Sequence, residues 1–266
     1  MTPVRKTDRM EVVPLPDPDT VARVAADAVE RLVTGRPDAV LGVATGSSPL
    51  GLYRELARRR AAGTGPDYGG VTAFLLDEYV GLAADHPQAY RATIAREVAG
   101  PLGIPLVHGP DPELLPDAGS AYETLLADAG GVDLQVLGIG GDGHLAFNEP
   151  GSSLVSRTRI KTLTARTRAD NARFFGSPDD VPRHVLTQGL GTILEARHLL
   201  LVALGAGKAA AVAAAVEGPL SASCPASVLQ LHPHATVLVD PAAASGLTRL
   251  DYYNEVWAGK PDWQRI

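Results

Sequence analysis

Residues 39–51 read Ala-Val-Leu-Gly-Val-Ala-Thr-Gly-Ser-Ser-Pro-Leu-Gly, and this stretch decides the fold class. An unbroken apolar run from Ala39 to Ala44 is followed by a polar turn with a glycine, and then by a helical stretch from Leu50 to about Arg60. An apolar strand, a glycine-bearing turn and a helix form one half of a βαβ unit. The stretch therefore predicts an α/β protein.

The same unit recurs along the chain. Further strands are predicted at 71–76, 132–137, 198–204 and 235–239, and Met10 opens a first one. Short strands that are apolar throughout, rather than alternating, are typical of a parallel sheet covered by helices on both faces. We therefore expect a Rossmann-like, doubly wound, mostly parallel sheet flanked by helices.

The chain is interpreted as a single domain over residues 10–266, after an N-terminal extension of residues 1–9. The extension carries Arg5, Lys6 and Arg9 with few apolar groups, so it is predicted to be disordered. Met10 is an alternative start of translation.

Composition excludes several classes of protein. The 266 residues are 45% hydrophobic, which is ample for a buried core, and the 24 Lys and Arg residues are scattered in a chain of net charge −6. A nucleic-acid partner is therefore not expected. The apolar runs are too short to span a bilayer and residues 1–9 are too polar for a secretory signal, so we expect no membrane partner and a cytoplasmic location. The single Cys224 cannot form an internal disulfide and is interpreted as a small hydrophobe.

Gly46, Ser47 and Ser48 lie between the strand ending at Ala44 and the following helix. Free backbone N–H groups, the helix dipole and two hydroxyls at such a turn can bind a phosphate. An equally good interpretation is a capped helix, with serine at the N-cap and Pro49 at the first helical position. Both interpretations stay open. The turn is not a Walker loop, because no lysine follows its glycine.

Asp77 and Glu78 come directly after the predicted strand 71–76. A carboxylate delivered from a buried strand into a crevice can act as a base, because partial burial raises its pKa toward neutrality. The alternative is that one of the two acids only caps the next turn. Two adjacent acids allow both roles, and Asp77 is the better candidate for the base.

The stretch from Gly138 to Pro150 places four glycines around Asp142, His144 and Glu149. Such glycine density indicates close approach of a ligand to the backbone. An imidazole with carboxylates beside it can be held in one tautomer and serve as a general acid near neutral pH. Metal binding by the same residues is the weaker hypothesis, since no second histidine lies at ligand spacing. No metal and no cofactor are therefore expected.

Together these motifs resemble the glucosamine-6-phosphate deaminase family, from Met10 to about Val239. The segments that carry the resemblance are Leu-Gly-Val-Ala-Thr-Gly-Ser-Ser-Pro-Leu-Gly (41–51), Leu-Asp-Glu-Tyr-Val-Gly-Leu (76–82), Gly-Gly-Asp-Gly-His-Leu-Ala-Phe-Asn-Glu-Pro (140–150), Ser-Arg-Thr-Arg-Ile-Lys-Thr-Leu-Thr (156–164), and Ala-Val-Glu-Gly-Pro with Leu-Gln-Leu-His-Pro (215–219 and 229–233). The resemblance implies an enzyme that converts glucosamine 6-phosphate and water to fructose 6-phosphate and ammonia, with a Rossmann-like fold and without nucleotide or metal.

The resemblance also implies roles for single residues. Asp77 would move a proton between C2 and C1 of the open-chain sugar, and His144 would assist ring opening, with Asp142 and Glu149 orienting it. The implied phosphate ligands are Gly46, Ser47, Ser48, Arg173 and Lys208. Taken by themselves, Arg173 is an ordinary helical arginine and Lys208 a surface lysine. The chain departs from the family at Ala89, where many members carry serine.

Two other functions compete with the deaminase. A hydrolase of 6-phosphogluconolactone would use the same phosphate loop but needs no C2 base. A sugar-phosphate-sensing module of a transcription regulator would need a DNA-binding helix-turn-helix, and too few residues precede the first predicted helix for one.

A hydroxyl-rich, basic cluster follows the glycine loop, and its members are Ser152, Ser153, Arg159, Lys161 and Thr162. Such a cluster can bind a second phosphate. The resemblance implies an effector site for N-acetylglucosamine 6-phosphate between the subunits of a homo-oligomer. A lid hinge whose basic residues pair with surface acids is an almost equally good interpretation.

Overall fold

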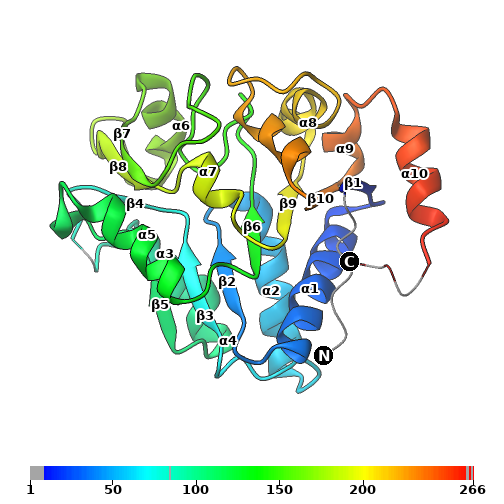
Figure 1. The fold of residues 1–266 in the computed structure, drawn as a ribbon, viewed down its shortest axis with the longest axis horizontal. Helices are drawn as coiled ribbons and strands as arrows, with labels where there is room; N and C mark the ends of the chain where they lie inside the picture. The colour runs from blue at the N-terminus through cyan, green and yellow to red at the C-terminus, as the bar shows by residue number, and fades with distance from the viewer. Residues whose placement is uncertain (1–8, 84, 262–263, 265) are drawn as a thin grey trace.

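The computed structural model describes residues 9–83, 85–261, 264 and 266 (Figure 1). The strands of its larger sheet are β1 (Arg9–Pro14), β2 (Val40–Val43), β3 (Thr72–Leu75), β5 (Leu106–His108), β6 (Leu134–Leu137), β9 (Leu199–Ala203) and β10 (His234–Val239). They lie in the order β1–β10–β9–β6–β2–β3–β5, and every neighbouring pair is parallel. The prediction of a doubly wound, mostly parallel sheet is confirmed.

The strand order of this sheet reverses between β2 and β6. From β2 the chain fills the sheet toward one edge through β3 and β5, and from β6 it fills the other side through β9 and β10. Ligands in such sheets bind outside the carboxyl ends of the strands at this reversal. Strand β5 is not predictable from the sequence, because this edge strand is only Leu-Val-His and its Leu106 is exposed.

Helices flank the larger sheet (Figure 1). The α-helices are α1 (Pro18–Gly35), α2 (Ser47–Ala61), α3 (Tyr90–Ile94), α4 (Gly100–Leu102), α5 (Ala118–Asp128), α6 (Ala165–Phe175), α7 (Leu190–Ile193), α8 (Ala209–Val216), α9 (Pro241–Ala244) and α10 (Leu250–Ala258). Tighter or wider helical turns are η1 (Ala95–Ala99), η2 (Pro112–Leu114), η3 (Ala206–Lys208) and η4 (Pro225–Leu231). Helix α1 begins as its sequence predicts, because the Asp17 side chain accepts a hydrogen bond from the Thr20 amide at 2.6 Å.

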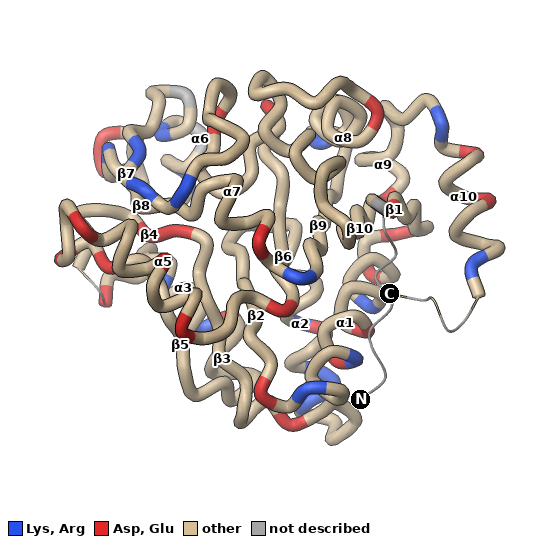
Figure 2. The backbone as a smooth tube through the Cα atoms, viewed as in Figure 1, with Lys and Arg blue, Asp and Glu red and all other residues tan. Residues whose placement is uncertain are grey.

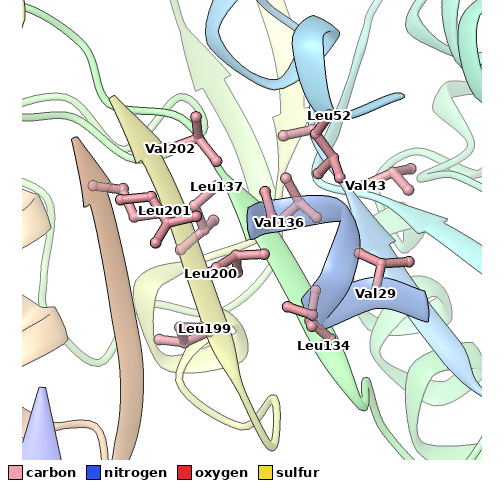
Figure 3. Close-up of a cluster of buried hydrophobic side chains, with 14 of the residues drawn as sticks. Val29, Val43, Leu52, Leu134, Val136, Leu137, Leu199, Leu200, Leu201 and Val202 are labelled. Atoms are coloured by element: carbon pink, nitrogen blue, oxygen red, sulfur yellow. The ribbon is translucent and has the colours of Figure 1, made fainter. Parts of the chain in front are cut away.

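The main core lies between these helices and the centre of the sheet. Figure 3 shows Val29 of α1 and Leu52 of α2 beside apolar side chains of β2, β6 and β9, among them Val43, Val136 and Leu200. Each of these side chains is almost completely buried, and burial of one such side chain contributes about 1.5–3 kcal/mol. The central strands are buried on both faces, which is why their sequences do not alternate.

A second, smaller sheet lies beside the larger one. Its strands are β4 (Asp77–Tyr79), β8 (His184–Thr187) and β7 (Arg159–Thr162), paired in that order and antiparallel. A separate apolar cluster packs here, with Tyr79, Phe147 and Val185 among its members. In Figure 1 β7, β8 and α6 lie together at the upper left. This sheet is not among the elements that the sequence predicts.

The ends and the surface of the molecule bear on three further expectations. The predicted disorder of residues 1–9 falls mostly on residues 1–8, which lie outside the described residues, while Arg9 already belongs to β1. Acidic and basic residues are interspersed along the chain in Figure 2, in keeping with a net charge of −6. Within the described ranges, we find no helix that combines the length and the apolar character needed to cross a membrane.

Candidate active site

A cavity of about 870 Å³ collects the polar motifs that follow the strands of the larger sheet. The predicted site residues that line it are Gly46, Ser47, Ser48, Asp77, Asp142, His144, Glu149, Arg173 and Lys208. They come from the segments after β2, β3, β6 and β9 and from α6. The structure therefore brings together every residue that the sequence proposes for catalysis and for phosphate binding.

The first wall of the cavity is the amino-terminal end of α2. Gly46 is its N-cap, with a left-handed φ of 112°, and as a glycine it has no side chain with which to cap the helix. The alternative of a serine N-cap followed by Pro49 is therefore wrong, because Ser47 and Ser48 are already the first two helical residues. Tyr53 fixes the preceding turn, since its hydroxyl lies 3.0 Å from both the amide and the carbonyl of Ala44. The free N–H groups and positive dipole end of α2 can receive an anion here.

Asp77 and Glu78 are both buried, but they have different surroundings. The Glu78 carboxylate accepts hydrogen bonds from the amides of Tyr79, Tyr90 and Arg91 at 2.8–2.9 Å and thereby caps α3. Within the described part of the chain, no hydrogen-bond donor reaches the Asp77 carboxylate, which lines the cavity. The structure thus assigns the capping task to Glu78 and leaves Asp77 free.

The environment of Asp77 favours a proton-accepting carboxylate. Its side chain belongs to a residue that is only 6% exposed. Burial and, after it, the nearby charge of Glu78 raise the pKa of Asp77 well above its ordinary value of 3.8. A carboxylate with a raised pKa is a stronger base than one in water, so this group suits abstraction of a proton from carbon.

The departure at Ala89 has a structural explanation. Ala89 is the N-cap of α3 and offers no side-chain acceptor. A serine at this N-cap would accept from the amide of Arg91 or Ala92, and Glu78 of the neighbouring strand already binds the Arg91 amide together with that of Tyr90. The helix end is therefore capped without the family's hydroxyl.

His144 is held by Asp142 at the edge of the cavity. Its Nδ1 lies 2.6 Å from Asp142 Oδ1, and its amide donates to the same oxygen at 3.2 Å. With Nδ1 bound to the carboxylate, Nε2 is the ring nitrogen available to a substrate. Burial alone would raise the pKa of Asp142, but the charge and hydrogen bonds of His144 outweigh it and leave that pKa lowered.

Gly140 explains part of the glycine density in this loop. A Cβ on Gly140 would lie 2.2 Å from His144 Nδ1, so the imidazole rests directly against the glycine backbone. Gly143 adopts a left-handed φ of 83°, and a Cβ there would lie 2.6 Å from the sulfur of Cys224. Side chains at either position would displace the loop that carries Asp142 and His144.

Glu149 is oriented differently from its sequence expectation. Its Oε1 accepts a hydrogen bond from the Thr164 hydroxyl at 3.1 Å and a second, short one from the Thr167 hydroxyl. These threonines form the amino-terminal turn of α6. Among the described residues, Asp142 is the carboxylate that contacts the His144 imidazole, and Glu149 is not. The buried Glu149 instead joins the glycine loop to α6.

The two predicted cations reach the cavity from different elements. Lys208 ends η3, which follows β9, whereas Arg173 lies in the last turn of α6, with its guanidinium 4.7 Å from the centre of the Phe174 ring. Aromatic side chains that the sequence motifs do not predict form a wall beside them, which includes Tyr79 and Tyr90 with their hydroxyls 3.2 Å apart. Tyr79 could have been found, because it lies two residues after Asp77 and side chains two apart on a strand share a face.

The candidate effector cluster lies outside this cavity. Arg159 and Lys161 occupy alternate, half-buried positions of β7 and share one face, while the exposed Thr162 projects from the other. Ser152 is buried, and its hydroxyl has no hydrogen-bond partner among the described residues. The structure thus places the two basic side chains on one face of β7, but the five residues of the cluster do not all share that face.

Comparisons with known proteins agree with this arrangement. Residues 18–238 match the family of glucosamine-6-phosphate isomerases and 6-phosphogluconolactonases. Glucosamine-6-phosphate deaminases from Mycolicibacterium smegmatis and Arthrobacter sp. are 58% and 59% identical to the chain, and each alignment covers 97% of it and 100% of the relative.

Solved structures give the same result. A monomeric glucosamine-6-phosphate deaminase is 38% identical, with a TM-score of 0.85 over 89% of this chain and 100% of that one. A 6-phosphogluconolactonase from Trypanosoma cruzi, 18% identical with a TM-score of 0.70 over 91% of this chain and 98% of that one, shares the fold. The chain belongs to the family of glucosamine-6-phosphate isomerases and 6-phosphogluconolactonases.

Proposed function

We propose that the chain is a glucosamine-6-phosphate deaminase, which converts glucosamine 6-phosphate and water to fructose 6-phosphate and ammonia. Its relatives at 58–59% identity carry this name over their whole length. The observation in the structure that carries the proposal is the buried Asp77 carboxylate, which faces the cavity without a donor among the described residues. Isomerisation of an aldose needs such a base, whereas binding of a sugar phosphate does not.

In this proposal Asp77 transfers one proton between neighbouring carbons of the open-chain sugar. The carboxylate removes the proton from C2, and the electron pair of the broken C–H bond forms a C1–C2 double bond. The electron pair of the C1=O double bond moves to O1 at the same time, and O1 takes up a proton from solvent. The carboxylic acid then returns the proton to C1, which leaves a C=N bond at C2. Addition of water to that bond and departure of the nitrogen as ammonia give the ketose. No electron enters or leaves the substrate, so the reaction needs no redox cofactor.

His144 acts before the proton transfer, at the ring oxygen of the cyclic sugar. The contact between its Nδ1 and Asp142 directs Nε2 to the substrate. A proton supplied to the ring oxygen weakens its bond to C1. The ring opens as the C1 hydroxyl loses its proton to solvent and becomes the aldehyde carbonyl. The role of Asp142 is to hold this geometry. Glu149, which bonds to Thr164 and Thr167, positions α6 over the cavity in our proposal.

The substrate phosphate binds at the α2 end of the cavity. The support is the uncapped helix terminus at Gly46, Ser47 and Ser48, together with the cations Lys208 and Arg173 on the same cavity. Backbone N–H groups and flexible cations are the usual partners of a phosphate.

One assay separates this function from its competitors. Purified protein, without added metal or nucleotide, is expected to release ammonia from glucosamine 6-phosphate. A 6-phosphogluconolactone hydrolase would produce acid from the lactone and no ammonia, and a sensing module would bind a sugar phosphate without turnover. Absence of ammonia release by folded, sugar-phosphate-binding protein would overturn the proposal.

We also propose that N-acetylglucosamine 6-phosphate activates the protein at the surface around Arg159 and Lys161, and that the chain forms a homo-oligomer there. The support is the shared face of the two basic side chains of β7 and the exposed apolar Val155 in the segment that precedes this strand. A solved relative is described as monomeric, so the molar mass in solution is the first measurement. Kinetics that stay hyperbolic and insensitive to the effector would contradict the regulatory role.

The proposed compartment is the cytoplasm, because a phosphorylated sugar does not cross membranes unaided and the enzyme must meet it where it is formed. Cell fractionation tests this placement.

A further inference from the structure

The two proposed catalytic groups sit on separate pieces of chain. Asp77 begins β4, and His144 lies in the loop that follows β6. Proton transfer and ring opening on one bound sugar require a fixed separation between the two groups. The structure shows one short segment, Thr187 and Gln188 at the end of β8, in contact with both pieces.

Gln188 forms hydrogen bonds with the two residues that directly precede Asp77. Its backbone amide donates to the Leu76 carbonyl at 2.7 Å, and its side-chain amide donates to the Leu75 carbonyl at 2.9 Å. Thr187 pairs with Asp77 itself in the antiparallel register of β4 and β8. The main chain that delivers the Asp77 carboxylate is therefore held from its β8 side.

The same segment also holds the loop that carries His144. The side-chain amide of Asn148 donates to the Gln188 carbonyl at 2.8 Å and to the Leu145 carbonyl at 3.0 Å. The Phe147 amide donates to the Thr187 hydroxyl at 3.2 Å. Asn148, Thr187 and Gln188 are at most 1% exposed, so water does not compete for these bonds.

Backbone strain in the loop shows that something must hold it. Ala146 has a φ of 50°, in the left-handed region that residues with a Cβ rarely adopt, and it lines the active-site cavity. It lies between Leu145 and Asn148, which form an antiparallel bridge, and the Asn148 side chain closes the same turn. Strained residues persist only where their surroundings fix them.

We propose that Gln188 and Asn148 are positioning residues that act in series to set the distance between the Asp77 carboxylate and the His144 imidazole. Asn148 ties the His144 loop to the Gln188 backbone, and the Gln188 side chain ties that backbone to the strand end before Asp77. The proposal rests on the proposed deaminase function. Neither residue lines the active-site cavity, so neither touches the substrate.

Loss of the Gln188 or Asn148 side-chain hydrogen bonds should reduce turnover more than it reduces binding of the sugar phosphate. The proposed phosphate ligands lie on α2, η3 and α6. Elements α2 and η3 make none of these hydrogen bonds, and α6 is joined to the loop by the Glu149 carboxylate rather than by Asn148. Both catalytic groups, in contrast, lie on the two pieces of chain that these hydrogen bonds connect. Misplacement of a catalytic group by about 1 Å costs about a hundredfold in rate. We therefore expect Gln188→Met and Asn148→Ala each to lower kcat by about tenfold to a hundredfold, with KM within about twofold of the wild-type value.

A matched control is available in Gln135. This glutamine is as buried as Gln188 and lines the same small cavity. Its side-chain amide donates to the Val136 carbonyl and, among the residues that the structure describes, to neither piece of chain that carries a catalytic group. Gln135→Met removes the same chemical group from a nearby strand and leaves the hydrogen bonds of Gln188 and Asn148 intact. Its kcat is expected to stay within about twofold of wild type.

The double variant tests whether the two residues act in series. If they form one link, Gln188→Met with Asn148→Ala lowers kcat no further than the worse single variant. Each kcat is referred to the number of sites that bind fructose 6-phosphate by calorimetry, so misfolded protein does not count. Exchange of the C2 proton with solvent should slow in parallel with kcat, because Asp77 is present but displaced.

Three results would overturn the proposal. One is kcat equal to that of the Gln135→Met control, another is full additivity in the double variant, and the third is loss of fructose 6-phosphate binding together with kcat in both single variants. The last result would show that the contacts only support the fold. If wild-type protein releases no ammonia, the deaminase function fails instead, and the two failures are distinguished.

Discussion

The two sheets supply different parts of the proposed chemistry. The larger sheet, buried on both faces, ends in the α2 terminus, the Asp142–His144 pair and Lys208. The smaller sheet starts with Asp77 and lies next to α6, which carries Arg173. Asp77, the proposed base, directly follows Leu76, where the chain passes from the larger sheet to the smaller one. In the proposed mechanism, catalysis therefore depends on the connection between the two sheets at Leu76 and Asp77 as much as on either sheet.

The largest effect is expected from removal of the proposed base, Asp77, which lies where the two sheets connect. Asp77→Asn keeps the shape of the side chain but cannot accept a proton, so deamination should fall by about a hundredfold to ten-thousandfold. Exchange of the C2 proton with solvent should disappear as well, while fructose 6-phosphate still binds. Near-normal turnover would remove Asp77 from the mechanism and leave the smaller sheet with a binding role only.

A smaller loss is expected on the side of the larger sheet. His144→Gln removes the proton donor for ring opening and should lower turnover of the cyclic substrate by about a hundredfold. Turnover of an open-chain analogue should fall much less, because that substrate bypasses the step. Equal slowing of both substrates would contradict a ring-opening role for His144.

The two phosphate cations test whether both sheets contribute to binding. Lys208→Ala removes a cation at the larger sheet, and Arg173→Ala removes one on α6. Each change deletes a charge-assisted contact worth about 1.5–3 kcal/mol, so each should raise KM by roughly tenfold to 150-fold. Arg168→Ala is the control, since Arg168 is on the same helix but bonds to the Pro178 carbonyl away from the cavity. An unchanged KM in Arg173→Ala alone would confine phosphate binding to the larger sheet.

The same contrast explains how much the sequence could predict. Strands such as Val40–Val43 and Leu199–Ala203 are apolar throughout, and their burial on both faces makes them recognisable without a structure. The order of motifs after these strands then places the site, because carboxyl ends of parallel strands share one edge. The larger sheet and its half of the site were therefore accessible to sequence reasoning.

The smaller sheet was not accessible, for a physical reason. Its strands Asp77–Tyr79 and Arg159–Thr162 are short and polar, and they become strands only by pairing with His184–Thr187, which is distant in sequence from Asp77. The orientation of Glu149 was hidden for the same reason. Its closeness to His144 in sequence suggested a contact with the imidazole, but the Thr164 hydroxyl at the start of α6 takes its carboxylate.

The smallest effect concerns the stability of the fold, and it distinguishes Asp77 from Glu78. Asp77 has a pKa raised above 3.8 in the folded protein, so the folded state holds its proton more tightly than the unfolded state. Its contribution to stability is therefore complete below pH 3.8 and is lost as the pH rises through the raised pKa. Above that pKa, Asp77→Asn replaces a buried charge by a neutral amide and should raise Tm, with a gain that fades toward pH 3.8. Glu78→Gln should lower Tm instead, because the Glu78 carboxylate accepts three backbone hydrogen bonds and an amide offers one oxygen fewer. Thermal unfolding of both variants between pH 4 and pH 8 checks the prediction. If Asp77→Asn lowers Tm throughout this range, the Asp77 carboxylate stabilises the folded protein instead of destabilising it. Its burial then no longer identifies it as the base.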